Sequence, residues 1–135
     1  MIRSIIAVVA GLFIGGLVNM GIIMASGALI PPPEGVDPSK IETIIANIDK
    51  YQPIHFLMPF LAHAMGTLVG AAIAYYLAVE NKMRGAIVIG VFFLVGGIMA
   101  VRMIPAPLWF DVLDLVGAYI PMAWLGSKIA GRLQG

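Results

Sequence analysis

Cysteine and charged side chains are what this sequence most lacks. Its 135 residues include no cysteine, and only 8 Lys or Arg and 7 Asp or Glu, so 11% of the chain is charged. Without cysteine, disulfides, Cys-type zinc sites and thiol chemistry are excluded. A soluble domain usually carries about a quarter charged residues, and this chain has too little polar surface to cover an apolar core in water. The formal net charge of +1 supplies no basic field, so no nucleic-acid partner is expected.

Known catalytic signatures are missing as well. The sequence has no P-loop, no GxSxG and no HExxH, and no nucleophile is paired in sequence with a base. Any catalysis would need residues that only the fold assembles, and we therefore expect no enzyme, no metal and no cofactor. A haem is not expected, because one histidine at mid-membrane depth supplies a single axial ligand. The first apolar run also lacks the buried glutamate of the small multidrug exporters.

Apolar residues are correspondingly abundant, at 61% of the chain with a mean hydropathy of +1.00. Four apolar runs, each near or above the roughly 20 residues that cross hydrocarbon, cover residues 5–30, 56–79, 85–104 and 112–130. They predict an all-α, integral membrane four-helix bundle that forms one transmembrane domain over residues 1–135, with the lipid bilayer as its solvent. A signal peptide is the alternative for the first run, but its apolar core is longer than about 15 residues, which favours a retained helix.

The distribution of basic residues predicts the orientation of these helices. The positive-inside rule places the side with more Lys and Arg in the cytoplasm. Five basic residues fall on the side of the termini: Arg3, Lys82, Arg84, Lys128 and Arg132. Three fall on the other side: Lys40, Lys50 and Arg102. Both termini are therefore expected in the cytoplasm. The opposite, outer face also holds six of the seven acidic residues, which makes it negative.

The loop over residues 31–55 is expected to contain a short amphipathic helix. Asp37 offers an N-cap and Pro38 a first helical residue. Isoleucines recur with helical spacing at Ile41, Ile44, Ile45 and Ile48. Their apolar face could lie among lipid headgroups or close as a lid on the helix ends, and the amphipathic pattern alone leaves both open.

A candidate intramembrane polar site comprises Asn19, His63 and Thr67. His63 lies eight residues, about 12 Å along a helix, beyond His55, and Asn19 lies at a comparable depth about 16 Å from Ile30. Asn19 and His63 could therefore hydrogen-bond between helices. Such a pair can simply hold helices together, at about 0.6 kcal/mol. It can also form a proton relay or a ligand site, as deep polar groups often do.

Small residues form stripes on the first two helices. The second apolar run repeats small or polar residues at steps of three or four, and Gly11, Gly15 and Asn19 do the same on the first. Stripes of this kind let helix backbones approach closely, so they could pack against each other, against a second copy or against a membrane-protein partner. Pro59, which lacks an N–H, should kink the second helix.

A candidate charge cluster lies at the outer end of the bundle and comprises His55, Arg102, Asp111 and Asp114. Because charges near hydrocarbon usually pair, we expect an Arg102–Asp114 ion pair that clamps the third and fourth helices together. The alternative is an outward-facing site, in which the imidazole and carboxylates take a divalent metal or Arg102 takes an anion.

Several segments together resemble a family of small bacterial inner-membrane proteins with four helices. They are HFLMPFLAHAMGTLVGA (55–71), IPAPLWFDVLDL (104–115), AYIPMAWLG (118–126) and the IPPP (30–33) that ends the first helix. The resemblance covers nearly the whole chain. It implies a bacterial inner-membrane location, but it supplies no activity and no catalytic residues.

Two functions remain from these observations. The main hypothesis is a non-enzymatic structural or accessory component that packs with itself or a partner through its Gly/Ala seams. The alternative is a small-molecule or proton-linked carrier or channel that uses the polar residues of the bundle. A water-filled cavity that reaches His63 would distinguish the second from the first.

Overall fold

The computed structural model describes residues 1–135 and is all-helical, with no strand. Its α-helices are α1 (Ile2–Leu29), α2 (Ile41–Ala46), α3 (Leu57–Leu77), α4 (Lys82–Met103), α5 (Leu108–Gly117) and α6 (Ile120–Leu133). Two 3₁₀ helices, η1 (Ile48–Lys50) and η2 (Pro53–Phe56), lie between α2 and α3. Four stretches are long and apolar enough to cross a membrane: Ile2–Leu29, Pro53–Leu77, Lys82–Met103 and Leu108–Leu133. The predicted all-α class is therefore confirmed.

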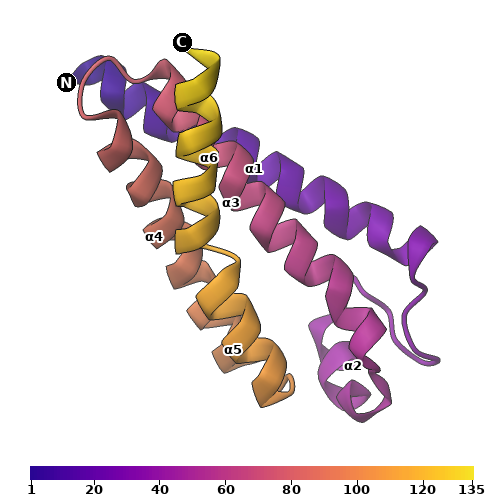
Figure 1. Ribbon diagram of the computed structural model, residues 1–135. Coiled ribbons are helices and arrows are strands. Elements are labelled where there is room, and N and C mark those ends of the chain that lie inside the picture. Colours follow the sequence, from indigo (N-terminus) through magenta and orange to yellow (C-terminus); the bar gives the residue numbers. More distant parts are fainter.

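The long helices form a bundle in which α3 is central. Both chain termini lie at one end, which we call the terminal end, together with the α3–α4 connection (Figure 1). From there α1 and α3 run side by side, while α6 and α4 pack on α3 from the other side. At the opposite, loop end, α1 and α3 diverge from α4 and α5, and α2 lies at that end (Figure 1).

Glycine sets the close approach of α1 to α3. A Cβ atom added at Gly11 would lie 2.5 Å from the Gly70 carbonyl oxygen, and one at Gly15 would lie 2.6 Å from that of Gly66. Only residues without side chains allow backbones this close. The small-residue stripes on the first two apolar runs therefore pack against each other within the chain.

The fourth apolar run differs from its prediction, because it is two helices rather than one over 112–130. α5 ends at Gly117 and α6 begins at Ile120. Pro121, in the first turn of α6, has no N–H to donate to the Gly117 carbonyl, and its ring disfavours a helix continuing from there. The backbone departs from helical angles at Tyr119, with φ −116° and ψ −80°. Proline in the first turn of a new helix is well tolerated.

The amphipathic helix exists but begins later than expected. α2 starts at Ile41 with Lys40 as its N-cap, rather than at Pro38. Asp37 instead forms a turn, in which its carboxylate accepts hydrogen bonds from the Ser39 N–H at 3.0 Å and hydroxyl at 2.6 Å. These bonds lower the pKa of Asp37 below its ordinary value. Ile44 faces a cavity between the helix ends, an arrangement that favours the lid alternative.

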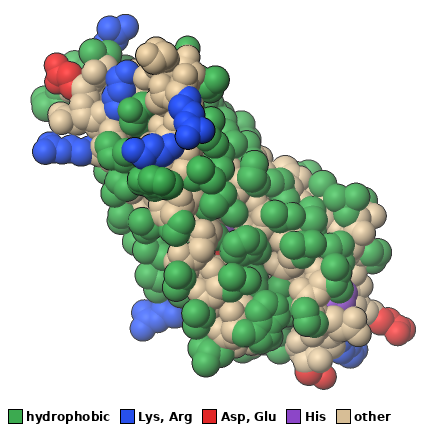
Figure 2. Space-filling view, viewed as in Figure 1, with side chains coloured by type: hydrophobic (Ala, Val, Ile, Leu, Met, Phe, Trp, Pro, Cys, Tyr) green, Lys and Arg blue, Asp and Glu red, His purple; other side chains and the backbone are tan.

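The surface carries a wide apolar zone between two polar ends. Hydrophobic side chains cover the length of the molecule, and Lys and Arg gather at the terminal end (Figure 2). Many large apolar side chains are well exposed, including Phe13 at 67% and Phe92 at 59%. Such a surface is far more apolar than water-soluble monomers usually present.

Candidate functional site

Three polar side chains meet in the middle of the bundle. The ring Nδ1 of His63, on α3, lies 2.8 Å from Oδ1 and 3.0 Å from Oδ2 of Asp114, on α5. The Tyr119 hydroxyl donates to Asp114 Oδ2 at 2.9 Å. The His63 and Tyr119 rings also stack, with centroids 5.8 Å apart. We call His63, Asp114 and Tyr119 the polar triad.

The helix break brings Tyr119 to Asp114. In a continuous α-helix, residues five apart point about 140° away from each other, given about 100° per residue. The non-helical backbone at Tyr119 removes this constraint, and the hydroxyl turns back to the carboxylate five residues earlier. Gly97 of α4 provides the space for the Tyr119 side chain, because a Cβ atom at residue 97 would lie 2.5 Å from the Tyr119 hydroxyl oxygen.

Asp114 is buried, with 3% of its surface exposed. A carboxylate out of water is costly unless it is hydrogen-bonded or paired with a positive charge, and the triad supplies both possibilities. Asp114 forms its hydrogen bonds with Nδ1 of His63. The other ring nitrogen, Nε2, makes no hydrogen bond within the chain. The His63 side chain is 25% exposed. Its Nε2 is therefore placed to bind a ligand or to exchange a proton.

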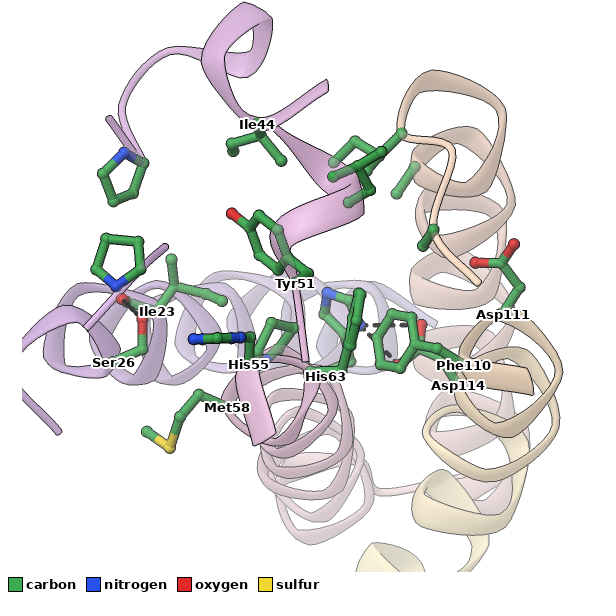
Figure 3. A pocket seen from close by; sticks show the side chains of 18 of the residues that line it. Ile23, Ser26, Ile44, Tyr51, His55, Met58, His63, Phe110, Asp111 and Asp114 are labelled. Carbon is green, nitrogen blue, oxygen red and sulfur yellow. Dashed lines mark hydrogen bonds and ion pairs between the residues drawn. The ribbon is translucent and has the colours of Figure 1, made fainter. Parts of the chain in front are cut away.

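A cavity of about 280 Å³ lies at the loop end, between α1, α3, α4 and α5 and beneath α2, and it is partly open to the surface. We call it the loop-end cavity (Figure 3). Its wall is mainly apolar, and its floor is formed by His63 and Asp114 (Figure 3). Its other polar side chains are Ser26, Tyr51, His55 and Asp111. Burial raises the pKa of Tyr51, so this phenol remains a hydrogen-bond donor at neutral pH.

A second cavity, the core cavity, adjoins the first and measures about 210 Å³. His63, Gly97 and Ala100 line both cavities, so the imidazole stands between them. The core cavity also contacts Asn19, whose Oδ1 atom is buried and has no hydrogen-bond partner. An unpaired buried acceptor is uncommon and costs about 1–3 kcal/mol.

The three residues of the expected intramembrane site lie around one cavity, but their hydrogen bonds differ from the prediction. Asn19, His63 and Thr67 all line the core cavity. The predicted Asn19–His63 hydrogen bond is not formed, since His63 bonds to Asp114. Thr67 donates to the His63 carbonyl oxygen one turn earlier at 2.8 Å, a common arrangement for a helical threonine.

The predicted Arg102–Asp114 ion pair is wrong. Asp114 lies six residues, about 9 Å, beyond the start of α5 at Leu108, and its side chain points to α3. Arg102, in the last turn of α4, is exposed and makes no ion pair. The prediction failed because it started the fourth helix at residue 112, which placed Asp114 too close to the loop.

The two remaining cluster residues lie at the loop-end cavity. Asp111 and His55 both line it, and His55 Nδ1 accepts a hydrogen bond from the Gln52 N–H at 2.8 Å within the cap of η2. The chain brings together no group of three or more His, Asp or Glu side chains that could hold a metal ion. The metal alternative for His55, Asp111 and Asp114 therefore has no ligand set.

Sequence reasoning missed the connection between its two candidate sites. It treated His63 as mid-membrane and Asp114 as peripheral, yet the two side chains are hydrogen-bonded. Tyr119 was not recognised at all. The available signal was Pro121, which predicts a break in the fourth run and hence an unusual direction for the preceding side chains.

Comparison with protein-family models, with curated proteins and with solved structures gives no match. The resemblance of the quoted motifs to small four-helix bacterial membrane proteins therefore stays a prediction. The polar triad and the two cavities are the features of the molecule that indicate a function.

Proposed function

We propose that this chain is a multi-pass protein of the bacterial inner membrane that carries a small molecule, with the polar triad as its binding and proton-exchanging group. The observation that carries the proposal is the loop-end cavity, which reaches from the end of the bundle to His63 and Asp114. A water-filled cavity that reaches His63 would distinguish a carrier from a passive component, and the depth of the loop-end cavity supports the carrier.

Placement in a membrane is supported by the four candidate spans and the apolar surface between the polar ends. The five basic residues on the side of the termini, against three on the other, favour cytoplasmic termini. In this orientation the loop end faces outward, and the loop-end cavity is the outward entrance to the triad.

The broken fourth span supports a carrier as well. Irregular backbone at membrane depth is tolerated where it is buried in protein or lines a cavity. In many transporters, discontinuous helices form the substrate site near the bilayer midplane. Here Tyr119, at the break between α5 and α6, lines the core cavity and bonds to the buried Asp114. An ionisable residue within a span is by default a candidate for function.

An accessory role through the glycine seams finds less support. Gly11 and Gly15 of α1 already face Gly70 and Gly66 of α3. A partner that used these seams would have to separate α1 from α3. Such a partner, or a second copy, would need another face of the bundle.

Single-cysteine labelling tests the proposal directly, because the chain has no cysteine of its own. Ala100 lines both cavities, whereas its neighbour Met99 is 59% exposed on the outside of α4. In intact cells, Ala100→Cys should react with membrane-impermeant methanethiosulfonates, and Met99→Cys, at the same depth but facing lipid, should not. A thiol reacts as its thiolate, which requires water.

Alternating access is the second part of this test. A carrier exposes its site to each side in turn, so Ala100→Cys should also react in inside-out vesicles, more slowly than in cells. Reaction from the outside alone would indicate a fixed binding pocket. No reaction from either side would overturn the proposed function.

A further inference from the structure

The two cavities are lined by acidic side chains but by no Lys or Arg. The titratable side chains that line them are Asp111 and Asp114 from α5, His55 and His63 from η2 and α3, and Tyr51 and Tyr119 from the connections. α1 contributes only Asn19 and Ser26 as polar residues, and neither cavity is lined by Lys or Arg. Arg102, on α4, lies outside both linings. The cavities therefore contain two carboxyl groups and no permanent positive charge.

The protein supplies a positive partner for Asp114 only when the His63–Asp114 pair takes up a proton. The neighbours of Asp114 are a neutral hydroxyl and an imidazole, and a buried carboxylate without a counter-charge is costly. One proton shared by His63 and Asp114 makes the pair neutral overall. A bound cation would do the same, so a proton and a cation compete for one place.

The remainder of the loop-end cavity suits an apolar body that carries this charge. Phe56 and Phe110, with ring centroids 4.7 Å apart, line it together with Tyr51. Aromatic faces attract organic cations by cation–π interaction. The volume of about 280 Å³ is slightly below that of common ligand pockets, about 300–1,000 Å³, so the molecule is small.

From these observations we infer that the ligand is a small organic monocation with an apolar body, exchanged for one proton at His63–Asp114. This inference rests on the proposed carrier function and names its substrate class. The exchange breaks one N–H bond of His63 and forms one O–H bond of water, and no other covalent bond changes. The cation enters beside Asp114, His63 Nε2 releases its proton to water, and the charge inside the bundle is unchanged.

The labelling assay can test the sign of the charge that the cavity prefers. Ala100→Cys is reacted with two methanethiosulfonates, one ending in trimethylammonium and one in sulfonate, and each rate is divided by that of a free thiol. The cationic reagent should react at least tenfold faster on this scale. Asp114→Asn, which keeps the size of the side chain and can still hydrogen-bond, should lower the ratio severalfold, and the carboxylate of Asp111 should keep it above one.

The control for this experiment is Asp49→Asn. It removes a carboxylate from the same end of the molecule but outside both cavities, so the ratio should be nearly unchanged. Equal normalised rates for the two reagents in Ala100→Cys would overturn the inference and leave the carrier intact. No reaction with either reagent would instead overturn the proposed function. If Asp114→Asn does not fold, the ratio in Ala100→Cys alone still tests the preference.

Competition with a proton is measured with benzyltrimethylammonium, which has no proton to lose. It should protect Ala100→Cys from labelling, and neutral benzyl alcohol should not. If binding of the cation releases one proton from the pair, the protecting concentration should fall about tenfold for each unit of rising pH, because the linkage is reciprocal. Protection that is independent of pH, or equal protection by benzyl alcohol, would contradict the exchange.

Discussion

At the scale of single residues, Asp114 connects most of the polar chemistry of this protein. Its two oxygens bond to His63 Nδ1 and to the Tyr119 hydroxyl, which come from different helical segments. It is also almost completely buried, at 3% exposure. Removing the carboxylate would leave the buried Tyr119 hydroxyl and Nδ1 of the partly exposed His63 without a partner, and an unpaired buried group costs about 1–3 kcal/mol.

We therefore predict that Asp114→Ala lowers the free energy of unfolding by about 2–4 kcal/mol, from two orphaned groups and a small cavity. Asp114→Asn should lose much less, because its amide can donate to His63 and its oxygen can accept from Tyr119. Unfolding by SDS in mixed micelles, followed by circular dichroism, measures both. Asp111→Ala, at a less buried carboxylate of the same helix, is the control. Equal stability of Asp114→Ala and the parent protein would show that the triad does not hold α3 to α5.

At the scale of helices, packing between α1 and α3 depends on which face of α1 carries glycine. Gly15 faces Gly66 across the contact, with no room for a methyl group. The adjacent Gly16 has open space around its Cβ position. These neighbours have the same residue type and helix, and they differ only in what they face.

Gly15→Ala should consequently separate α1 from α3 and lower the free energy of unfolding by about 1–3 kcal/mol. Gly16→Ala should leave it unchanged or raise it by up to about 1 kcal/mol, since alanine favours a helix over glycine. Thermal melting in detergent, with both variants beside the parent, gives the comparison. If the two variants melt together, the close α1–α3 contact does not exist.

The helix break between α5 and α6 belongs to the same scale. Pro121 removes one backbone hydrogen bond. On either side of it the helical bonds persist, because the backbone N–H groups of Ala118 and Ala123 donate to the backbone carbonyl oxygens of Asp114 and Tyr119. The lost regularity is therefore confined to one turn. The break lets the Tyr119 hydroxyl reach the carboxylate of Asp114, five residues earlier in the same span. A regular helix would not allow this contact.

At the scale of the whole molecule, the two ends differ in charge and in structure. The terminal end joins the α3–α4 connection through polar contacts, such as Lys82 Nζ to Gln134 Oε1 at 2.7 Å. The loop end holds α2, the 3₁₀ helices and the entrance to the loop-end cavity. Orientation in the membrane thus decides which side of the cell the cavity faces.

We predict that Ser39→Cys, in the exposed loop before α2, reacts with an impermeant thiol reagent in intact cells. Gly135→Cys, at the exposed terminal end, should react only after the cells are opened. The positive-inside rule is the physical reason, with five basic residues on the terminal side and three on the other. The reverse pattern of labelling would place the cavity entrance in the cytoplasm.

The sequence alone determined the helical class and the four apolar stretches, because length and hydropathy are local properties that need no knowledge of contacts. It also identified Asn19, His63, Thr67, Asp111, Asp114 and His55 as unusual polar groups. Only the tertiary structure decided their partners. Whether Asp114 meets Arg102 or His63 depends on where α5 starts, which way its face turns and where Pro121 interrupts the span. These quantities arise from packing between distant segments.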